Sequence, residues 1–349
     1  MANVYYTKIN NQTTAKQIQK ITRRLLSRII EEENIKLLSE IPLKVHFGEK
    51  GNVTFIKSEN YQGIIDFLRA RKIKTCFIET NVLYAGQRHK KKLHLKLAKE
   101  HGFTQLPIII ADGEYGEDFE EVEVNKKHFK TCKIGRAFGD YQQMIVLSHF
   151  KGHKMAGFGG AIKQLSMGCA SRGGKLAMHM GEKPQINQKK CVKCHLCETR
   201  CNENAITINE KESFIDQNKC VGCGACTAVC PHNAISIMSV KGVAKAFGLG
   251  HNFKECLVEY AYAASKDKKN IYLNFVMNIT KGCDCEARSM KPLMDDIGIF
   301  ISTDPVSIDQ ACFNVVKKRG KMFKGKSQLV YAQKIGLGER KYRLVWLSL

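Results

Sequence analysis

The chain has 349 residues, 44% of them hydrophobic and 26% charged, and a formal net charge of +23. This length suits two or three domains, and the composition is that of a globular protein. The first residues, MANVYYTKINNQ, lack the basic stretch and apolar run of an export signal, and no apolar run approaches the roughly 20 residues that span a bilayer. These features argue against an exported or membrane-spanning protein, so we expect a cytoplasmic one.

The positive charge is compatible with several kinds of partner. Nucleic acid, acidic membranes, phosphorylated substrates and an acidic redox protein are all attracted by a field of this sign. The excess is mostly lysine spread along the chain, so a compositional bias with solvated lysines explains it equally well. No nucleic-acid-binding motif accompanies the charge, which makes nucleic acid the least favoured partner.

The first half of the chain alternates between helix and strand patterns. An amphipathic helix is predicted by the spacing of Ile18, Ile21, Leu25 and Ile29. Apolar runs predict buried strands over 43–47, 74–79, 106–111 and 144–150. This alternation predicts an α/β fold, with a mixed or mostly parallel sheet and helices on its faces.

The strand over 144–150 leads into the glycine-rich stretch SHFKGHKMAGFGGAIKQLSMGCASRGGK, residues 148–175. Ligands of α/β sheets bind at the carboxyl ends of strands, so this stretch is our first choice for an active site. His149 and His153 offer acid, base or metal-ligand chemistry near neutral pH. The cations that could hold an anion are Lys151, Lys154, Lys163 and Arg172. An ordinary glycine-rich turn without a ligand is the alternative.

Cys169 in the same stretch is a candidate nucleophile or ligand, although a lone cysteine is most often a small buried side chain. The catalytic candidates of this stretch are therefore His149, His153, Lys163 and Cys169. GFGGAI lacks the third glycine of the dinucleotide-binding fingerprint, so it gives no support to a nicotinamide or flavin cofactor.

Eight of the 15 cysteines lie in two blocks, CVKCHLCETRC and CVGCGACTAVCP, between residues 191 and 230. Each block has the spacing C-x2-C-x2-C-x3-C, in which three thiolates of one loop and a fourth from the other block hold a four-iron cluster. One predicted [4Fe-4S] cluster is held by Cys191, Cys194, Cys197 and Cys230. The other is held by Cys220, Cys223, Cys226 and Cys201. A pair of tetrahedral zinc sites is the alternative.

The two blocks repeat at an offset of 29 residues, which also maps Asn204-Ala205-Ile206 onto Asn233-Ala234-Ile235. The repeat predicts two pseudo-symmetric units, each with a cysteine loop that runs into a short strand. The segment resembles a bacterial-type ferredoxin with two four-iron clusters, except that Asn202 stands where the second block has Pro231. A pair of neighbouring clusters moves single electrons, so we expect electron transfer. Polar linkers are expected at 181–190 and 241–252.

Strand patterns resume over 271–279, 297–302 and 342–349. The first of these strands runs into GCDCEARS, in which Cys283 and Cys285 can both reach one metal ion, with Asp284 and Glu286 as further oxygen ligands. Free cysteines in a turn are the alternative, because a disulfide between them would close a small, strained ring. Cys283 and Cys285 join the catalytic candidates.

Two motifs near the C-terminus have plain structural explanations. In STDPVSID, Asp304 is a good N-cap and Pro305 suits the first helical position. GKMFKGKS, residues 320–327, satisfies the phosphate-binding consensus G-x-x-x-x-G-K-S. A helical pattern precedes it where the consensus requires a strand, so we interpret the match as accidental.

Longer stretches of the chain resemble one family. They are KVHFGE (44–49), IETNVLYAGQR (78–88), the segment 145–175, CDCEARSMKPLMDDIGIFISTDPVSIDQA (283–311) and YAQKIGLGERKYRLV (331–345). All are similar to the iron-sulfur branch of the domain-of-unknown-function family 362. The resemblance implies an α/β domain in two parts, 1–185 and 241–349, with a ferredoxin-like module inserted at 186–240. It implies no substrate, and two independent domains are the alternative.

Three functions fit these features. The first is an iron-sulfur oxidoreductase, in which two [4Fe-4S] clusters relay single electrons from an external donor to a substrate or metal site on the α/β domain. A third metal ion and a small anionic ligand stay open for that site. The second is an electron carrier or assembly factor that docks an acidic protein partner and has no substrate of its own. The third is a nucleic-acid-binding iron-sulfur protein.

Overall fold

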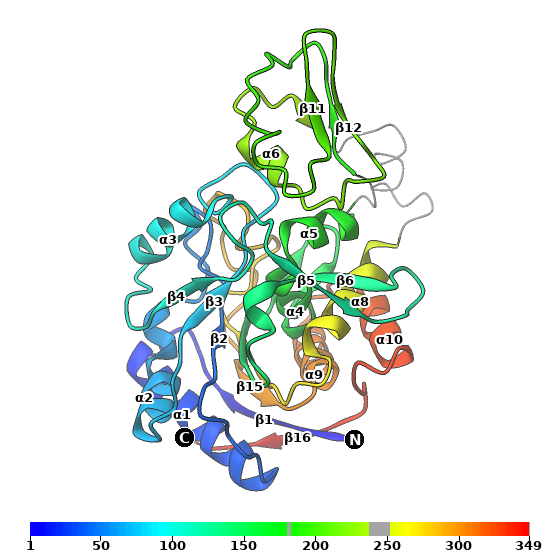
Figure 1. Ribbon diagram of the computed structural model, residues 1–349. Coiled ribbons are helices and arrows are strands. Elements are labelled where there is room, and N and C mark those ends of the chain that lie inside the picture. The colour runs from blue at the N-terminus through cyan, green and yellow to red at the C-terminus, as the bar shows by residue number, and fades with distance from the viewer. Residues whose placement is uncertain (180–182, 237–251, 349) are drawn as a thin grey trace.

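The structure is a computed structural model that describes residues 1–179, 183–236 and 252–348. The predicted linkers at 181–190 and 241–252 fall partly outside these ranges. The described residues form a mixed sheet of eight strands in the order β16-β1-β15-β14-β7-β2-β3-β4 (Figure 1). In chain order these strands are β1 (Ala2–Lys8), β2 (Leu43–Lys44), β3 (Phe77–Glu79), β4 (Ile108–Ile110), β7 (Ile145–His149), β14 (Ile271–Val276), β15 (Gly298–Ser302) and β16 (Tyr342–Trp346).

The sheet is mostly parallel. β15 runs antiparallel to its neighbours β1 and β14, whereas every other pairing in this sheet is parallel. The α/β fold class predicted from the sequence is thereby confirmed, and each of the seven predicted strands corresponds to a strand of this sheet. β1 was not predicted from the sequence, because polar residues near both ends of the strand leave only a short apolar centre. This centre pairs with β15 and β16.

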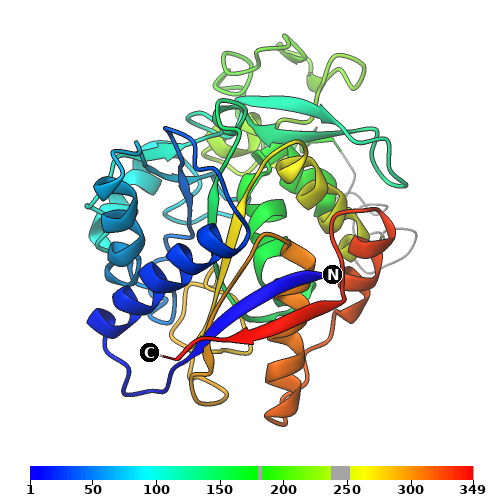
Figure 2. The ribbon, with the colours of Figure 1, turned by 90° about the horizontal axis from the view of Figure 1, so that it is seen from below.

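Helices cover both faces of the sheet, and each face has its own apolar core (Figure 2). One face is covered by α1 (Ala15–Glu32), α2 (Gln62–Ala70) and α3 (Lys91–Glu100). The other is covered by α4 (Ala161–Cys169), α8 (Phe253–Ser265), α9 (Pro305–Lys318) and α10 (Lys326–Lys334). Side chains alternate between the faces along each strand: Ile145 and Leu147 enter the first core and Val146 the second. Each such buried side chain contributes about 1.5–3 kcal/mol.

Local signals set where the helices begin. Thr14 caps α1 in a capping box, in which the Gln17 amide donates to Thr14 Oγ1 and Gln17 Oε1 accepts from the Thr14 amide. Asp304 caps α9 by accepting from the amides of Val306 and Ser307, as the sequence predicted. The loop with GKMFKGKS follows α9 and precedes α10, so a helix does precede it.

Residues 185–236 form small elements with a core of their own, at the top of Figure 1. They are β10 (Gln185–Ile186), β11 (Ile206–Ile208), β12 (Ser213–Ile215), α6 (Ala225–Val229) and β13 (Ile235–Ser236). β10 pairs with β13, and β11 pairs with β12. The large sheet takes strands from both sides of this segment in the sequence.

The two units of the predicted internal repeat make equivalent hydrogen bonds. The amide of Ala205 donates to Cys201 Sγ and the amide of Ala234 donates to Cys230 Sγ, both at 3.3 Å. The preceding asparagine in each unit has a positive φ of nearly equal size, 47° and 49°. The two cysteine loops therefore have the same local backbone geometry.

Shorter elements complete the described chain. They are the hairpin of β5 (Phe119–Glu123) and β6 (Thr131–Gly135), the hairpin of β8 (Lys151–His153) and β9 (Gly157–Gly159), α5 (Arg172–His179), and the 3-10 turns Ser58–Tyr61 and Arg136–Phe138. Among the described residues, no helix has the length and apolar character needed to cross a membrane.

Candidate active site

Four neighbouring parallel strands end at one edge of the sheet and carry polar residues there. His46 follows β2, Glu79 ends β3, and His149 ends β7. The loop with Cys283 and Cys285 follows β14. Because these strands are parallel neighbours, their carboxyl ends bring together residues that lie far apart in the sequence.

The turn 283–285 is anchored by its central residue, Asp284, which is fully buried. One carboxylate oxygen of Asp284 lies 2.7 Å from Lys151 Nζ, and both oxygens lie 3.0 Å from His149 Nδ1. The other ring nitrogen of His149 donates to the Met277 carbonyl at 2.8 Å. Burial disfavours the carboxylate, but His149 and Lys151 outweigh burial and hold the pKa of Asp284 well below its usual range.

The two flanking thiols lie next to the ammonium group of Lys163. Cys283 is 2% exposed, and Lys163 Nζ on α4 donates to Cys283 Sγ at 3.5 Å. A hydrogen bond from Cys285 and the charge of Lys163 lower the pKa of Cys283, against the effect of burial, and the same bond raises the pKa of Cys285. Burial by itself would lower the pKa of Lys163, but Cys283 and its neighbours in the turn outweigh burial, and the pKa of Lys163 is raised. Cys283 is therefore the thiol of the pair whose ionisation its surroundings favour.

His153 reaches this pair because the backbone of β8 passes very close to the loop after β14. The amide of Gly152 donates to the Thr280 carbonyl at 2.8 Å. A Cβ at Gly152 would lie only 2.3 Å from the carbonyl oxygen of Lys281, so a side chain at this position would push the two segments apart. A ring nitrogen of His153 and the sulfur atoms of Cys283 and Cys285 consequently lie within 4.8 Å of one another.

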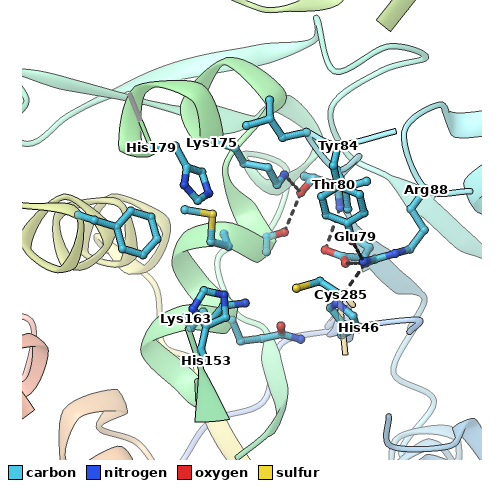
Figure 3. A pocket seen from close by; sticks show the side chains of 16 residues that line it. His46, Glu79, Thr80, Tyr84, Arg88, His153, Lys163, Lys175, His179 and Cys285 are labelled. Atoms are coloured by element: carbon cyan, nitrogen blue, oxygen red, sulfur yellow. Dashed lines mark hydrogen bonds and ion pairs between the residues drawn. The ribbon is translucent and has the colours of Figure 1, made fainter. Parts of the chain in front are cut away.

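Among the residues described above, His46, Glu79, His153, Lys163 and Cys285 line a cavity with about 630 Å³ of empty space, part of it open to solvent (Figure 3). Its charged lining consists of Lys163, Lys175, Arg88 and Glu79. Glu79 is already paired with the buried Lys44 at 2.9 Å and with Arg88 at 3.5 Å. The remaining cations favour an anionic ligand in the cavity.

Burial shifts the pKa of two lining residues in the direction that favours the uncharged side chain. Burial lowers the pKa of Lys175 to about 8, while Asp112 nearby opposes the shift. Lys175 Nζ donates to Thr80 Oγ1 and to the Ala170 carbonyl, both at 2.6 Å. Burial, with Lys163 nearby, lowers the pKa of His153 to about 3, so its imidazole is neutral at physiological pH. Lys175 can thus exchange a proton with a bound ligand near neutral pH.

The six catalytic candidates from the sequence have three different placements. His153, Lys163, Cys283 and Cys285 lie together at or beside the cavity. His149 lies behind them and supports Asp284. Cys169 is fully buried in the apolar core at the end of α4 and does not line the cavity.

Three of the four cations suggested for anion binding lie outside the cavity lining. The side chain of Lys154 is 76% exposed and pairs with Glu286 at 3.4 Å. Arg172 is buried and donates to backbone carbonyls of Tyr115, Leu83 and His89. Lys151 is buried but serves Asp284.

Sequence reasoning missed a second group of lining residues, which are His46, Glu79, Arg88 and Lys175. Arg88 donates to Glu49 Oε2 at 3.1 Å and faces His46 Nε2, also at 3.1 Å. Burial, followed by the charge of Arg88, lowers the pKa of His46 well below its usual value. The strand-end rule that selected His149 applies equally to β2 and β3, and would have found His46 and Glu79.

The eight cysteines of residues 191–230 were predicted to form two sets of four, each with its fourth member from the opposite block. Cys191, Cys194, Cys197 and Cys230 together line a cavity with about 350 Å³ of empty space, so Cys230 of the second block lies there with three cysteines of the first. Burial, with Cys201 and Cys220 nearby, raises the pKa of Cys223.

The second cysteine loop packs directly against α5. A Cβ at Gly173 would lie 2.6 Å from the Gly222 carbonyl oxygen and 2.9 Å from Cys223 Cα. A Cβ at Gly224 would lie 2.8 Å from Leu176. The same helix supplies Lys175 to the cavity lining, so α5 contacts both this loop and the candidate active site.

Comparison with known proteins identifies a matching family and distantly similar solved structures. Residues 41–314 match the family described as "Domain of unknown function (DUF362)". The chain is similar to a crystal structure of a protein from Thermotoga maritima at 10% identity, with a TM-score of 0.44, over 93% of this chain and 60% of that one. It is also similar to the lactate racemase apoprotein from Thermoanaerobacterium thermosaccharolyticum at 11% identity, with a TM-score of 0.39, over 79% of this chain and 51% of that one.

The chain thus spans less than two thirds of either solved protein. No curated protein matches it.

Proposed function

The chain belongs to the DUF362 family, and from this premise we propose that it is an iron-sulfur oxidoreductase that passes single electrons to the cavity at the strand ends. In this proposal residues 186–240 are a ferredoxin-like module with two [4Fe-4S] clusters. The module is inserted between the two parts of one α/β domain, 1–185 and 241–349. When bound, the clusters supply one-electron transfer.

The cysteine geometry supports clusters. Four thiols from two blocks line one cavity, and backbone amides donate to the sulfur atoms of Cys201, Cys220 and Cys230 at 3.3–3.4 Å. Amide hydrogen bonds of this kind stabilise the negative charge of cluster thiolates and tune their potential. The donor set is all sulfur, which suits iron-sulfur clusters well.

The contact between the module and α5 carries the proposal. It places the set Cys201, Cys220, Cys223 and Cys226 next to the helix that supplies Lys175 to the cavity. Cys194 of the other set is solvent-exposed, where an external donor protein can approach. We therefore assign the first set as the inner one and the set of Cys194 as the outer one.

Residues of the α/β domain would prepare the receiving site. Lys163 holds the Cys283 thiolate, and Lys175 gives or takes a proton near neutral pH. Arg88 and the two lysines attract a small anionic substrate. Burial of these groups strengthens each interaction, because little water screens it.

The second candidate is an electron carrier or assembly factor that docks an acidic partner. A cavity lined by buried ionisable residues from both flanks counts against it, since a carrier needs no such site. Nucleic-acid binding ranks last, since only the net charge of +23 favours it.

The experiment counts iron in the anaerobically reconstituted full chain. We expect about eight irons, and an electron paramagnetic resonance spectrum of two interacting clusters after reduction. Cys194→Ser and Cys223→Ser should each perturb one cluster, whereas Cys76→Ser, outside the tract, should leave both unchanged. About four irons in the unmodified chain, or zinc in place of iron, would contradict the proposal.

A further inference from the structure

Three soft donor atoms converge beside the cavity from two separate loops. His153 comes from β8, and Cys283 and Cys285 come from the loop after β14. One atom of each lies within 4.8 Å of the other two. Cys285 and His153 also line the cavity, so the group has an open side (Figure 3).

We propose that Cys283, Cys285 and His153 bind a thiophilic divalent transition-metal ion of the zinc class, with its fourth coordination position open to the cavity. Two thiolates and one imidazole are a donor set that zinc prefers, and three protein ligands with an open position are typical of catalytic sites. The inference deepens the proposed function and rests on it in one respect: a zinc-class ion has no redox chemistry, so it would hold and polarise, as a Lewis acid, the substrate that receives the electrons. Metal binding itself does not require the clusters.

The surroundings hold these donors in place. Asp284 ties the turn to His149 and Lys151, which fixes the backbone from which both thiols project. The close approach of Gly152 to Lys281 keeps His153 against the same turn. Lys163 donates to Cys283 Sγ and would stay as a hydrogen-bond donor to a metal-bound thiolate, the kind of outer partner that orients metal ligands.

One hydrogen bond competes with the metal. The amide of Ala156 donates to Nδ1 of His153 at 3.0 Å and occupies the lone pair of the neutral ring. A metal ion would take the lone pair of the imidazole in place of this amide hydrogen. A neutral amide hydrogen bond is weak compared with a metal site that has two thiolates, so the exchange favours the metal.

The charge balance defines the fourth ligand. Two thiolates neutralise a divalent ion, and the neutral His153 adds no charge. Arg88 is already paired with Glu49 and Glu79, and Glu79 also with Lys44, so the positive charge left in the lining comes from Lys163 and Lys175. We therefore assign a small anionic oxygen or sulfur donor to the open position, in agreement with an anionic substrate.

The test uses zinc as the probe and the anaerobically reconstituted full chain with its irons counted. We expect about one zinc per chain in addition to iron, and X-ray absorption at the zinc edge should show two sulfur neighbours at about 2.3 Å and a nitrogen at about 2.0 Å. Zinc misplaced in the cysteine tract would instead show four sulfur neighbours, so the spectrum separates the two locations. A spectrum without this mixed shell overturns the inference.

Three variants assign the ligands. Cys285→Ser, His153→Gln and Cys283→Ser should each lose the zinc and keep the iron, whereas Cys76→Ser, at the opposite end of β3, should keep both. Unchanged zinc in the first three variants would overturn the inference even if the iron count is as proposed. Conversely, a zinc site with mixed ligands in a chain without clusters would uphold the inference while the proposed function fails. Because the spectrum of the unmodified chain is decisive by itself, a variant that does not fold leaves the test intact.

Discussion

At the scale of single residues, the central carboxylate of the C-x-C turn determines where its two thiols lie. Asp284 is buried, with His149 on one side and Lys151 on the other. Because Lys151 is buried too, solvent cannot stabilise either the carboxylate or the ammonium group if its partner is removed. Breaking a buried ion pair by removing one charge is far more costly than breaking an exposed pair. Asp284 is therefore a positioning residue.

Asp284→Asn keeps the shape of the side chain and removes its charge. We expect a loss of about 3–5 kcal/mol in the free energy of unfolding at pH 7, since the buried Lys151 would lose its ion pair. Urea denaturation measures this loss. The matched control is Asp118→Asn, which breaks an exposed pair with Arg136 and should cost less than about 1 kcal/mol. An equal effect of both changes would contradict the role of Asp284.

The pKa of Asp284 also gives this contribution a pH dependence. Because the pKa is lowered on folding, the stabilisation is complete above the unfolded carboxyl value of about 4 and is lost as the pH falls through the folded value. The difference between the unmodified chain and Asp284→Asn should therefore shrink below about pH 4. A constant difference would mean that the side chain acts by its shape.

At the scale of elements, the site depends on two loops that touch through their backbones. The hairpin of β8 and β9 approaches the loop after β14 so closely that Gly152 has no room for a side chain. This approach joins His153 to Cys283 and Cys285.

Gly152→Ala should separate the hairpin from the loop. A Cβ 2.3 Å from the Lys281 carbonyl oxygen meets backbone, which cannot rotate away, so we expect a loss of about 1–3 kcal/mol or more in the free energy of unfolding. Gly159→Ala in the same hairpin is the control, since its nearest neighbour is the flexible side chain of Lys163 at 3.0 Å. Thermal or urea unfolding compares the two, and an equal loss would refute the backbone contact.

At the scale of the whole molecule, the two halves of the proposed electron path meet at α5. Gly173 and Gly174 are neighbours on this helix, but a Cβ at Gly173 would meet the second cysteine loop, whereas one at Gly174 would meet Lys133 of β6 at 2.5 Å. Alanine at Gly173 or at Gly174 adds the same methyl group, but the two methyl groups point toward different neighbours.

Gly173→Ala should loosen the module without disturbing β6. We expect amide hydrogen exchange in 220–226 to rise by about five- to hundred-fold, which corresponds to about 1–3 kcal/mol of overpacking. Gly174→Ala should raise exchange mainly in 131–135 and affect 220–226 much less, through the hydrogen bond from Lys133 Nζ to the Val221 carbonyl. Hydrogen-exchange mass spectrometry reads both segments in one experiment. If Gly174→Ala affected 220–226 as strongly, the specific contact with α5 would be refuted.

The sequence by itself determined the features that depend on local periodicity and spacing. Alternation of apolar runs with an amphipathic helix predicted the α/β class, and the spacing of the two cysteine blocks predicted the cysteine sets, of which Cys191, Cys194, Cys197 and Cys230 line one cavity. Such features depend on neighbours within a few residues or on a repeat. His149 shows the limit of this reasoning, since its place at a strand end was predicted but its role beside Asp284 was not.

Only the tertiary structure decided which residues share the cavity. His46 and Arg88 meet because the parallel strands β2 and β3 bring their carboxyl ends to one edge, and Lys175 joins them from α5. By sequence, Cys169 is a lone thiol and Cys283 belongs to a C-x-C pair, and both were catalytic candidates. The fold buries Cys169 among hydrophobic side chains and sets Cys283 beside Lys163, and this long-range contact gives the two thiols different chemistry.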